Sequence, residues 1–441
     1  MAEGSLRERL QRLRRGPASL PPANDLERLE DSFLLAPQGG LSLKQRLERL
    51  VSAATRAERR RGRTASIEDL VPGQRVTNER GEFFLVEDSV HLDRGHGELP
   101  LARIRSVRPG SVGILAAEPS LDSFDLSGAA FIDTETTGLA GGTGTAAFLI
   151  GVGYVEDDRF RVRQFLMRDY HEEAALLRGL AEELARFAQI VTFNGKIFDV
   201  PLLESRYRLN RERYPLEQAL HLDLLHPARR LWKMRLESCR LQSLESALLG
   251  VRRYGDVPGE EIPRIYFDYV RSRDASALPQ VLEHNRLDIV SLAALAVLAC
   301  QWVEDSWAED PRDVYSLARV FERAEMYELS DAHYRRLVDD AAAVRTVRVP
   351  SLLALATRAK RAGDLATAVE LWEQAAEAGD CLALRELAVH HEHRSRDLSA
   401  ALLTVDRALT RFDGNGEPAA RWVAEDFRRR RERLMTKLQR H

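Results

Sequence analysis

The chain has 441 residues, of which 44% are hydrophobic and 30% charged, and its formal net charge is −3. This length predicts two or three domains, and the composition is typical of a globular chain rather than a disordered one. The net charge gives no global signature of nucleic-acid binding, and no uninterrupted apolar run reaches the ~18 residues that a membrane span needs.

The cysteines and the first residues indicate a compartment. The three cysteines, Cys239, Cys300 and Cys381, are scattered and form no CxxC spacing. This argues against a zinc site or a disulfide framework and favours a reducing compartment. Residues 1–16 lack the apolar segment of a signal peptide. We therefore expect a cytoplasmic protein that has no membrane partner.

The first 120 residues divide into two predicted regions. Residues 1–72 are predicted to form a charged helical arm, with arginines concentrated at positions 56–63. That cluster is either a solvated helix face or a phosphate-contacting arm. Residues 73–120 are predicted to form a small β-hairpin region. Two β-rich runs flank Asn78-Glu79-Arg80-Gly81, where Gly81 would supply the positive φ of the turn.

Residues 121–305 are predicted to form an α/β domain. Apolar runs at 129–136, 146–155, 160–167 and 190–194 predict strands. Between the last two runs, leucines at helical spacing predict a helix over residues 171–188. Further helices are predicted at 199–210, 240–250 and 282–303, with Gly250 as a C-cap. This order indicates a mixed sheet covered by helices.

Residues 310–441 are predicted to be helical and repetitive. Ala368 matches Ala401 and Ala375 matches Ala408 at a shift of about 33 residues, and a looser copy places Ala332 about 36 residues before Ala368. Small residues at such positions let paired helices approach closely, and this period is typical of tetratricopeptide hairpins. The sequence therefore predicts tetratricopeptide-like repeats, with a possible protein partner.

Three distant segments place acidic residues beside apolar runs. Asp133 and Glu135 lie two residues apart and would share one face of a strand. Asp199 would open a helix, and Asp288 lies four residues after His284, on the same face of a helix. Carboxylates at the edge of a core repel one another unless a cation compensates them. Four converging carboxylates would form an oxygen-rich cage for Mg²⁺ or Mn²⁺.

Several of these residues allow a second interpretation. Asp199 alone could be an N-cap, and His284 is either a general base, an orienter of water or a structural histidine. Asn194 could turn the chain or bind a substrate, and Asp223 is either an acid supporting the site or a plain strand end. The basic segment 229–240 could hold a single strand and stack a base on Trp232, or be a solvated helix face with a buried tryptophan.

Together these motifs resemble the DEDD superfamily of 3′–5′ exonucleases, which have a ribonuclease H-like fold. The pair Asp133 and Glu135 fits its DxE motif, and Asn194 to Asp199 fits N-x(2–3)-F/Y-D. Asp288 supplies the last acid. More closely, residues 133–154, 221–232, 241–250 and 284–292 resemble the YprB-like branch of ribonuclease H-like proteins, in which tetratricopeptide-type helices can follow the nuclease-like domain.

The resemblance implies an α/β ribonuclease H-like domain acting on single-stranded 3′ ends of DNA or RNA with two Mg²⁺ or Mn²⁺ ions. It implies that one ion is held by Asp133, Glu135 and Asp288, and that the second is held by Asp133 with Asp199. Thr134 and Asn194 would lie near the terminal nucleotide. The catalytic residues would be Asp133, Glu135, Asp199, His284 and Asp288.

One departure from the family pattern concerns the histidine. His284 stands four residues before the last acid, where the family's tyrosine subtype has its tyrosine. Both roles, base and orienter of water, therefore stay open. The alternative functions are a nucleic-acid-binding protein or a repeat-based adaptor, each with little turnover.

Overall fold

The computed structural model describes residues 65–138, 144–412 and 418–440. The chain divides into two units, residues 1–64 and residues 65–441. A charged arm was predicted over residues 1–72. Its first 64 residues, which include the arginine cluster, lie outside the described residues. The description below concerns the second unit, which opens with the short helix α4 (Ile67–Leu70).

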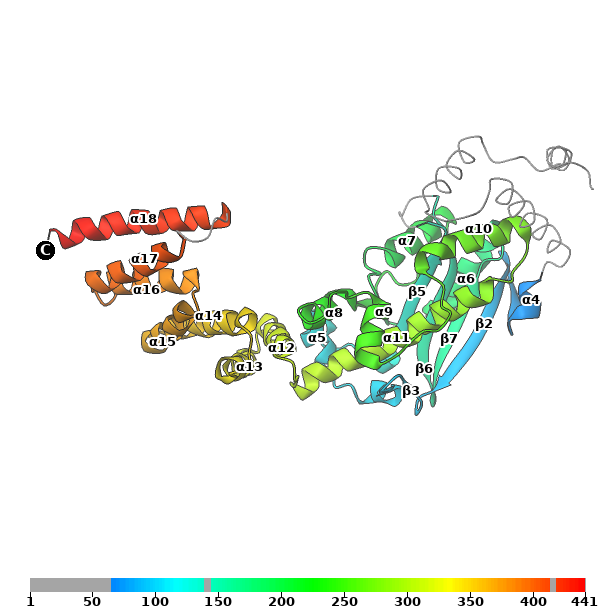
Figure 1. The fold of residues 1–441 in the computed structure, drawn as a ribbon. Helices are drawn as coiled ribbons and strands as arrows, with labels where there is room; N and C mark the ends of the chain where they lie inside the picture. The colour runs from blue at the N-terminus through cyan, green and yellow to red at the C-terminus, as the bar shows by residue number, and fades with distance from the viewer. Residues whose placement is uncertain (1–64, 139–143, 413–417, 441) are drawn as a thin grey trace, which may run out of the picture. The chain divides into compact units, whose positions relative to one another are not determined.

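Seven strands form one mixed sheet in the order β1-β2-β7-β6-β5-β8-β9 (Figure 1). The strands are β1 (Gln74–Asn78), β2 (Gly81–His91), β5 (Ala130–Thr136), β6 (Ala147–Glu156), β7 (Arg159–Leu166), β8 (Gln189–Thr192) and β9 (Leu220–Asp223). The pairs β5–β8 and β8–β9 are parallel, and the other neighbours are antiparallel. The predicted mixed sheet is confirmed.

The predicted hairpin forms one edge of this sheet. Asn78 pairs with Gly81, whose φ is +129°, so the glycine adopts the positive φ that the turn predicted. Strand β2 then pairs with β7, and the sheet therefore runs across the limit predicted at residue 120. Between β2 and β5 lie β3 (Gly95–His96), β4 (Leu99–Pro100), α5 (Ser111–Ala116) and the 3₁₀ turns η1 (Leu101–Ser106), η2 (Pro119–Leu121) and η3 (Leu126–Gly128).

Alternate residues of β5 enter two hydrophobic cores. Phe131 packs in a core with Ile289 and the following apolar residues of α11 (Leu278–Asp305), whereas Ile132 packs in a core with α6 (Glu173–Leu184) and α10 (Ile262–Ser272). This alternation follows from the period of two along a strand. The remaining helical elements of this domain are η4 (Tyr170–Glu172), α7 (Asp199–Leu209), α8 (Leu225–Trp232), α9 (Leu241–Leu244), the π-helical turn η5 (Glu245–Leu249) and η6 (Gly259–Glu261).

Helix α11 runs along the sheet because two glycines of β6 make room for it (Figure 1). A Cβ atom on Gly151 would lie 2.1 Å from Cδ1 of Ile289 and 2.3 Å from Oδ1 of Asn285, and one on Gly153 would lie 2.3 Å from Cγ2 of Ile289. Among the described residues, α11 is the one helix long and apolar enough to cross a membrane, and 67% of its most apolar window is buried inside the structure. Its position against the sheet accounts for that apolarity.

The C-terminal region is helical, as predicted. Its helices are α12 (Pro311–Arg323), α13 (Tyr327–Asp339), α14 (Arg345–Ala362), α15 (Leu365–Glu377), α16 (Cys381–His393), α17 (Leu398–Phe412) and α18 (Pro418–Leu438), and each packs against the next. Helix α12 also enters the core of the α/β domain, where Val314, Leu317 and Phe321 pack in the same cluster as Trp232.

The alanines of the predicted repeat differ in their burial. Ala368 and Ala401 are fully buried, as close helix packing requires, but Ala332 is exposed. The residue of α13 that corresponds to Ala368 is the buried Ser330, which lies about 38 residues before it. A tetratricopeptide-like character of these helices stays a prediction.

Candidate active site

Four predicted acids meet where β5, α7 and α11 come together. Burial, and then the charges of Asp288 and Asp199, raise the pKa of Asp133 well above its usual value. Burial, and then the charges of Asp133, Asp288 and Asp199, do the same to the pKa of Glu135. Burial raises the pKa of Asp199 to about 6, and it also raises that of Asp288. The charges of Asp133, Asp199 and Asp288 thus act on one another or on Glu135, which places the four carboxylates in one cluster.

The surrounding side chains fix two of these acids. The Nδ2 group of Asn285 donates to Oδ2 of Asp133 over 2.8 Å, and the buried Gln164 donates to Oδ1 of Asn285 over 2.9 Å. The hydroxyl of Thr134 donates to Oδ1 of Asp199 over 2.5 Å. Asp199 is the first residue of α7, and its carboxylate faces the cluster instead of acting as the N-cap, which is Phe198.

Both ring nitrogens of His284 contact carboxylates. Its Nδ1 lies 2.9 Å from Oδ1 of Asp256, and its Nε2 lies 3.5 Å from Oδ2 of Asp288 and 3.9 Å from Oε1 of Glu135. Burial alone would raise the pKa of Asp256, but the hydrogen bond from His284 and the charge of Arg253 outweigh it and lower that pKa. The imidazole is thus held by Asp256 on one side and presented to the acid cluster on the other.

Arg253 is a component of the site that sequence reasoning missed. Its guanidinium donates to both oxygens of Glu245 at 2.7 Å, to Oδ2 of Asp256 at 3.1 Å and to Oδ1 of Asp288. These contacts raise the pKa of Arg253 although burial opposes the shift. One signal was available in the sequence, since Glu245 interrupts an apolar helix and a buried carboxylate there requires a cation.

The loop after β8 is shaped by Asp223. Its Oδ1 accepts from the backbone N–H groups of Asn194 at 2.7 Å and Leu225 at 3.1 Å, and its Oδ2 accepts from that of Lys196 at 3.1 Å. Asn194 adopts a φ of +69° at this turn. Asp223 is therefore a buried support of the loop before Asp199. Within the described part of the chain, the side chain of Asn194 has no hydrogen-bond partner, and its amide is available to a ligand.

The basic segment around Trp232 does not form a stacking surface. The indole is fully buried and packs edge-on against Trp302, with ring centroids 5.6 Å apart. Arg235 pairs with Asp313, and Arg230 donates to the carbonyl oxygen of Ala116. The alternative that a base stacks on Trp232 is therefore wrong, because the ring fills the core beneath α8.

The donor set of the acid cluster fits a hard divalent cation. Carboxylate oxygens are the ligands that Mg²⁺ and Mn²⁺ prefer. Burial, and after it the charges of neighbouring acids, raises the pKa values of Asp133 and Glu135, and a bound cation would relieve the repulsion between these charges. Among the described residues, no three His, Cys, Asp or Glu side chains form a ready-made metal cage. Arg253, Asn285 and Thr134 each occupy one oxygen of Asp288, Asp133 and Asp199, and the second oxygen of each carboxylate would remain for an ion.

Comparison with known proteins places this site in a family. The RNase H superfamily matches residues 130–300, which begin at β5 and end within α11. The chain is also 33% identical over 287 residues to a Bacillus subtilis (strain 168) protein named "Uncharacterized protein YprB", an alignment that covers 64% of this chain and 68% of YprB. Residues 130–300 therefore form a domain of the ribonuclease H superfamily, and the chain belongs to the same family as YprB.

The ribonuclease H domain contains every predicted catalytic residue. Asp133 lies near its first matched residue and Asp288 near its last, so the superfamily match spans the complete acid cluster together with His284. Membership in the superfamily supports nuclease activity and nucleic acid as the ligand. The segment that holds Arg253 and Asp256 also lies within the matched range.

Proposed function

We propose that this protein is a 3′–5′ exonuclease that hydrolyses phosphodiester bonds of DNA or RNA with two divalent metal ions. The observation that carries the proposal is the meeting of four carboxylates from three distant segments beside a histidine held by a fifth carboxylate. Acids that repel one another in a largely buried site lower the stability of the fold, and a catalytic role accounts for that cost.

The residues divide into groups with separate tasks. Asp133, Glu135 and Asp288 would hold one Mg²⁺ or Mn²⁺ ion, and Asp133 with Asp199 would hold the second. When bound, such ions activate water and stabilise the charge that develops on the phosphate and the leaving oxygen. Thr134 would act through Asp199, whose carboxylate its hydroxyl positions.

His284 is proposed to accept the proton of the attacking water at Nε2. Because Asp256 accepts from Nδ1, the neutral ring carries its proton there and leaves Nε2 free as a base. The negative charge of Asp256 then stabilises the imidazolium that forms, in the way that an aspartate orients the histidine of a catalytic triad. Arg253 holds Asp256 and Asp288 at a fixed separation and is a positioning residue.

Substrate binding is proposed for the loop before α7. The free amide of Asn194 can donate to the sugar or phosphate of the terminal nucleotide. Beside it, Ile197 and Phe198 are 63% and 52% exposed, although large apolar side chains are usually buried. These two side chains provide an apolar surface for the terminal base next to Asp199.

The test uses oligonucleotides labelled at the 5′ end, with the 3′ end free or blocked, in the presence of Mn²⁺. The parent protein should shorten the free strand stepwise and leave the blocked strand intact. Asp133→Asn should reduce the rate by at least ~100-fold, because it removes a ligand proposed for both ions. Asp268→Asn, which changes an exposed acid on α10, is the matched control.

Two results would contradict parts of this proposal. Equal degradation by Asp133→Asn and the parent protein would remove the catalytic assignment of the acid cluster. Cleavage of the blocked strand at internal positions would show an endonuclease and contradict the exonuclease assignment alone.

A further inference from the structure

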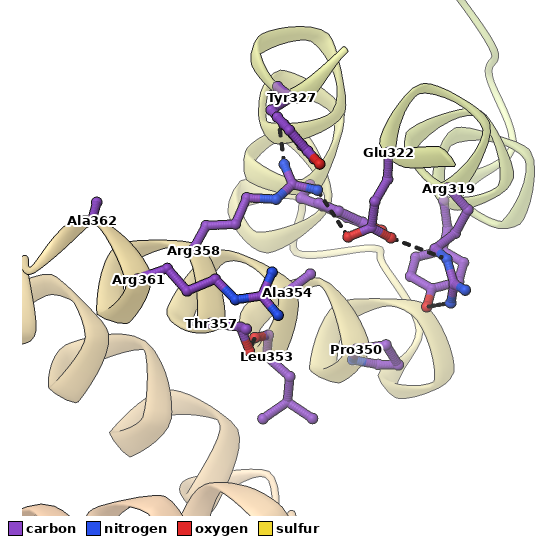
Figure 2. Close-up of a pocket in the computed structure, with 12 residues that line it drawn as sticks. Arg319, Glu322, Tyr327, Pro350, Leu353, Ala354, Thr357, Arg358, Arg361 and Ala362 are labelled. Atoms are coloured by element: carbon purple, nitrogen blue, oxygen red, sulfur yellow. Dashed lines mark hydrogen bonds and ion pairs between the residues drawn. The ribbon is translucent and has the colours of Figure 1, made fainter. Parts of the chain in front are cut away.

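A second site lies in the C-terminal helical region, outside the matched domain. Helices α12, α13 and α14 enclose a hollow of about 790 Å³ (Figure 2). This volume is within the usual range of ligand sites. The side chains that line it include three arginines, three tyrosines and one glutamate: Arg319, Arg358, Arg361, Tyr315, Tyr327, Tyr334 and Glu322.

One arginine of the hollow is structural. Arg358 donates to Oε1 of Glu322 at 2.9 Å, to the hydroxyl of Ser330 at 3.0 Å and to the carbonyl oxygen of Tyr327 at 3.2 Å, and it also pairs with Asp331. Figure 2 shows the guanidinium between Tyr327 and Glu322. Arg358 therefore joins α14 to α12 and α13, and its donors are not available to a ligand.

The other two arginines retain donors for a ligand. Arg361 is exposed and, within the described residues, has no hydrogen-bond or ion-pair partner. The side chain of Arg319 is 45% exposed, and it shares Glu322 with Arg358, with an Nε–Oε2 distance of 3.3 Å. Two guanidinium groups with unused N–H donors therefore face a hollow that contains one glutamate. This charge balance favours an anion that binds guanidinium forks, such as a phosphate.

An exposed aromatic ring stands at the same hollow. Tyr327 is 51% exposed, and the guanidinium carbon of Arg358 lies 5.1 Å from its ring centroid. The contact with Arg358 fixes the ring while half of the residue remains accessible. Leu353 and Ala354 of α14 also line the hollow (Figure 2). A fixed exposed ring beside cationic groups is the combination that holds single-stranded nucleic acid.

Helix α12 connects this hollow to the ribonuclease H domain. One of its faces contributes Arg319 and Glu322 to the hollow, and another contributes Leu317 and Phe321 to the core that contains Trp232. The pairing of Arg235 with Asp313 fixes the start of the same helix. The wall of the hollow is thus part of the catalytic domain's own packing.

We propose that this hollow binds a segment of single-stranded nucleic acid, with phosphates on Arg319 and Arg361 and a base on Tyr327. The inference rests on the proposed function in one respect, the preference for nucleic acid over an acidic peptide as the anion. The exposed tyrosine supports the same choice, because bases offer a flat face for stacking and carboxylate side chains do not. The site would retain the strand away from the acid cluster.

The test measures binding of the full-length protein to a fluorescent oligothymidylate of about 12 nucleotides in EDTA, by anisotropy, over a range of salt concentrations. The double variant Arg319→Gln/Arg361→Gln should bind about 10-fold more weakly. The slope of its log affinity against log salt concentration should fall by about one to two, because each phosphate contact contributes roughly 0.7 to that slope. Tyr327→Leu should weaken binding about 5-fold without changing the salt slope.

Controls separate this proposal from folding defects and from the proposed function. Arg335→Gln, which changes an exposed arginine of α13 that does not line the hollow, should bind as the parent does. Arg361→Gln alone should retain the parent's circular dichroism and melting temperature, because this side chain has no partner within the described residues to lose. Binding in EDTA needs no turnover, so a parent protein that binds the strand in EDTA but does not hydrolyse it in Mn²⁺ would contradict the proposed function and leave this site standing.

Two outcomes would overturn the proposal. One is a double variant whose affinity and salt slope equal those of the parent. The other is a polyglutamate peptide that binds the parent and not the double variant, while the oligonucleotide binds both equally, since the hollow would then be a peptide site.

Discussion

Nδ1 of His284 lies 2.9 Å from Oδ1 of Asp256, and this contact turns Nε2 of the same ring toward Glu135 and Asp288. Asp256 stands outside the four-acid cluster and is itself held by Arg253 at 3.1 Å. The ring orientation therefore depends on a loop residue 28 positions away in the chain. This relationship gives the first prediction.

Asp256→Asn should lower kcat by roughly 10- to 100-fold and leave KM nearly unchanged. The substitution keeps the shape of the side chain but removes the charge that would stabilise a protonated His284. The acidic limb of the pH–rate profile should also shift, which a purely structural role would not cause. Steady-state kinetics from about pH 5 to pH 9 checks this. An unchanged profile of Asp256→Asn would contradict the proposal that Asp256 orients His284 as the base.

Arg253→Lys should destabilise the protein by about 1–3 kcal/mol, because lysine cannot reproduce the two parallel hydrogen bonds to Glu245. Both side chains are almost completely buried, at 6% and 2% exposure, so water cannot replace the lost donors. Urea denaturation measures the change. The neighbouring Arg252 is exposed and has no ion pair within the described ranges, so Arg252→Lys is the matched control and should be neutral. Equal stability of the two variants would contradict the packing role of Arg253.

Gly151→Ala should reduce both stability and activity. The added Cβ would lie 2.1 Å from Ile289 and 2.3 Å from Asn285, so α11 must move away from β6 and carry Asp288 with it. We expect a loss of about 2 kcal/mol and at least a 10-fold lower rate. Gly259→Ala is the control, since a Cβ there meets nothing within 4 Å. A fully active Gly151→Ala protein would show that the helix position is not critical.

The raised pKa of Asp199 predicts how stability depends on pH. The folded state holds the proton of Asp199 up to about pH 6, whereas the unfolded chain releases it near pH 3.8. The contribution of Asp199 to stability is therefore present below about pH 3.8 and lost as pH rises through about 6, by on the order of 3 kcal/mol. Asp199→Asn should flatten this part of the profile in metal-free protein, whereas Asp268→Asn should not.

The same protons compete with metal ions. Mn²⁺ should raise the melting temperature more at about pH 7.5 than at about pH 5, because ligand carboxylates must be ionised to bind. Differential scanning fluorimetry with and without EDTA tests this. Asp133→Asn should abolish the metal-dependent increase. A shift that is the same at both pH values would indicate a metal site elsewhere in the chain.

Local patterns predicted the parts of the site that depend on one element at a time. The period of two along a strand placed Asp133 and Glu135 together, and the four-residue spacing on a helix placed His284 beside Asp288. The contact of the Thr134 hydroxyl with Asp199 was not predicted, because it joins a strand to a helix that begins 65 residues later.

The hydrophobic periodicity of the sequence could not predict the contacts of side chains in loops, nor the alignment of helices in repeats of unequal length. Arg253 reaches Asp288 from an irregular segment after η5, where no spacing rule fixes a side chain. The repeat phase at Ala332 was wrong because α13 uses Ser330 where α15 uses Ala368. Burial of Trp232 was readable, since it follows Ala228 and Leu231 at helical spacing and all three are buried.

Helices α12 and α14 limit where the chain can be divided. Val314 and Phe321 of α12, together with Val347 of α14, complete the hydrophobic core that contains Trp232. A gene fusion or truncation that separates the two halves between residues 305 and 347 would leave that core open to water. The first three C-terminal helices therefore belong to the same packing unit as the α/β domain, and a truncated chain that keeps this core closed must extend through α14.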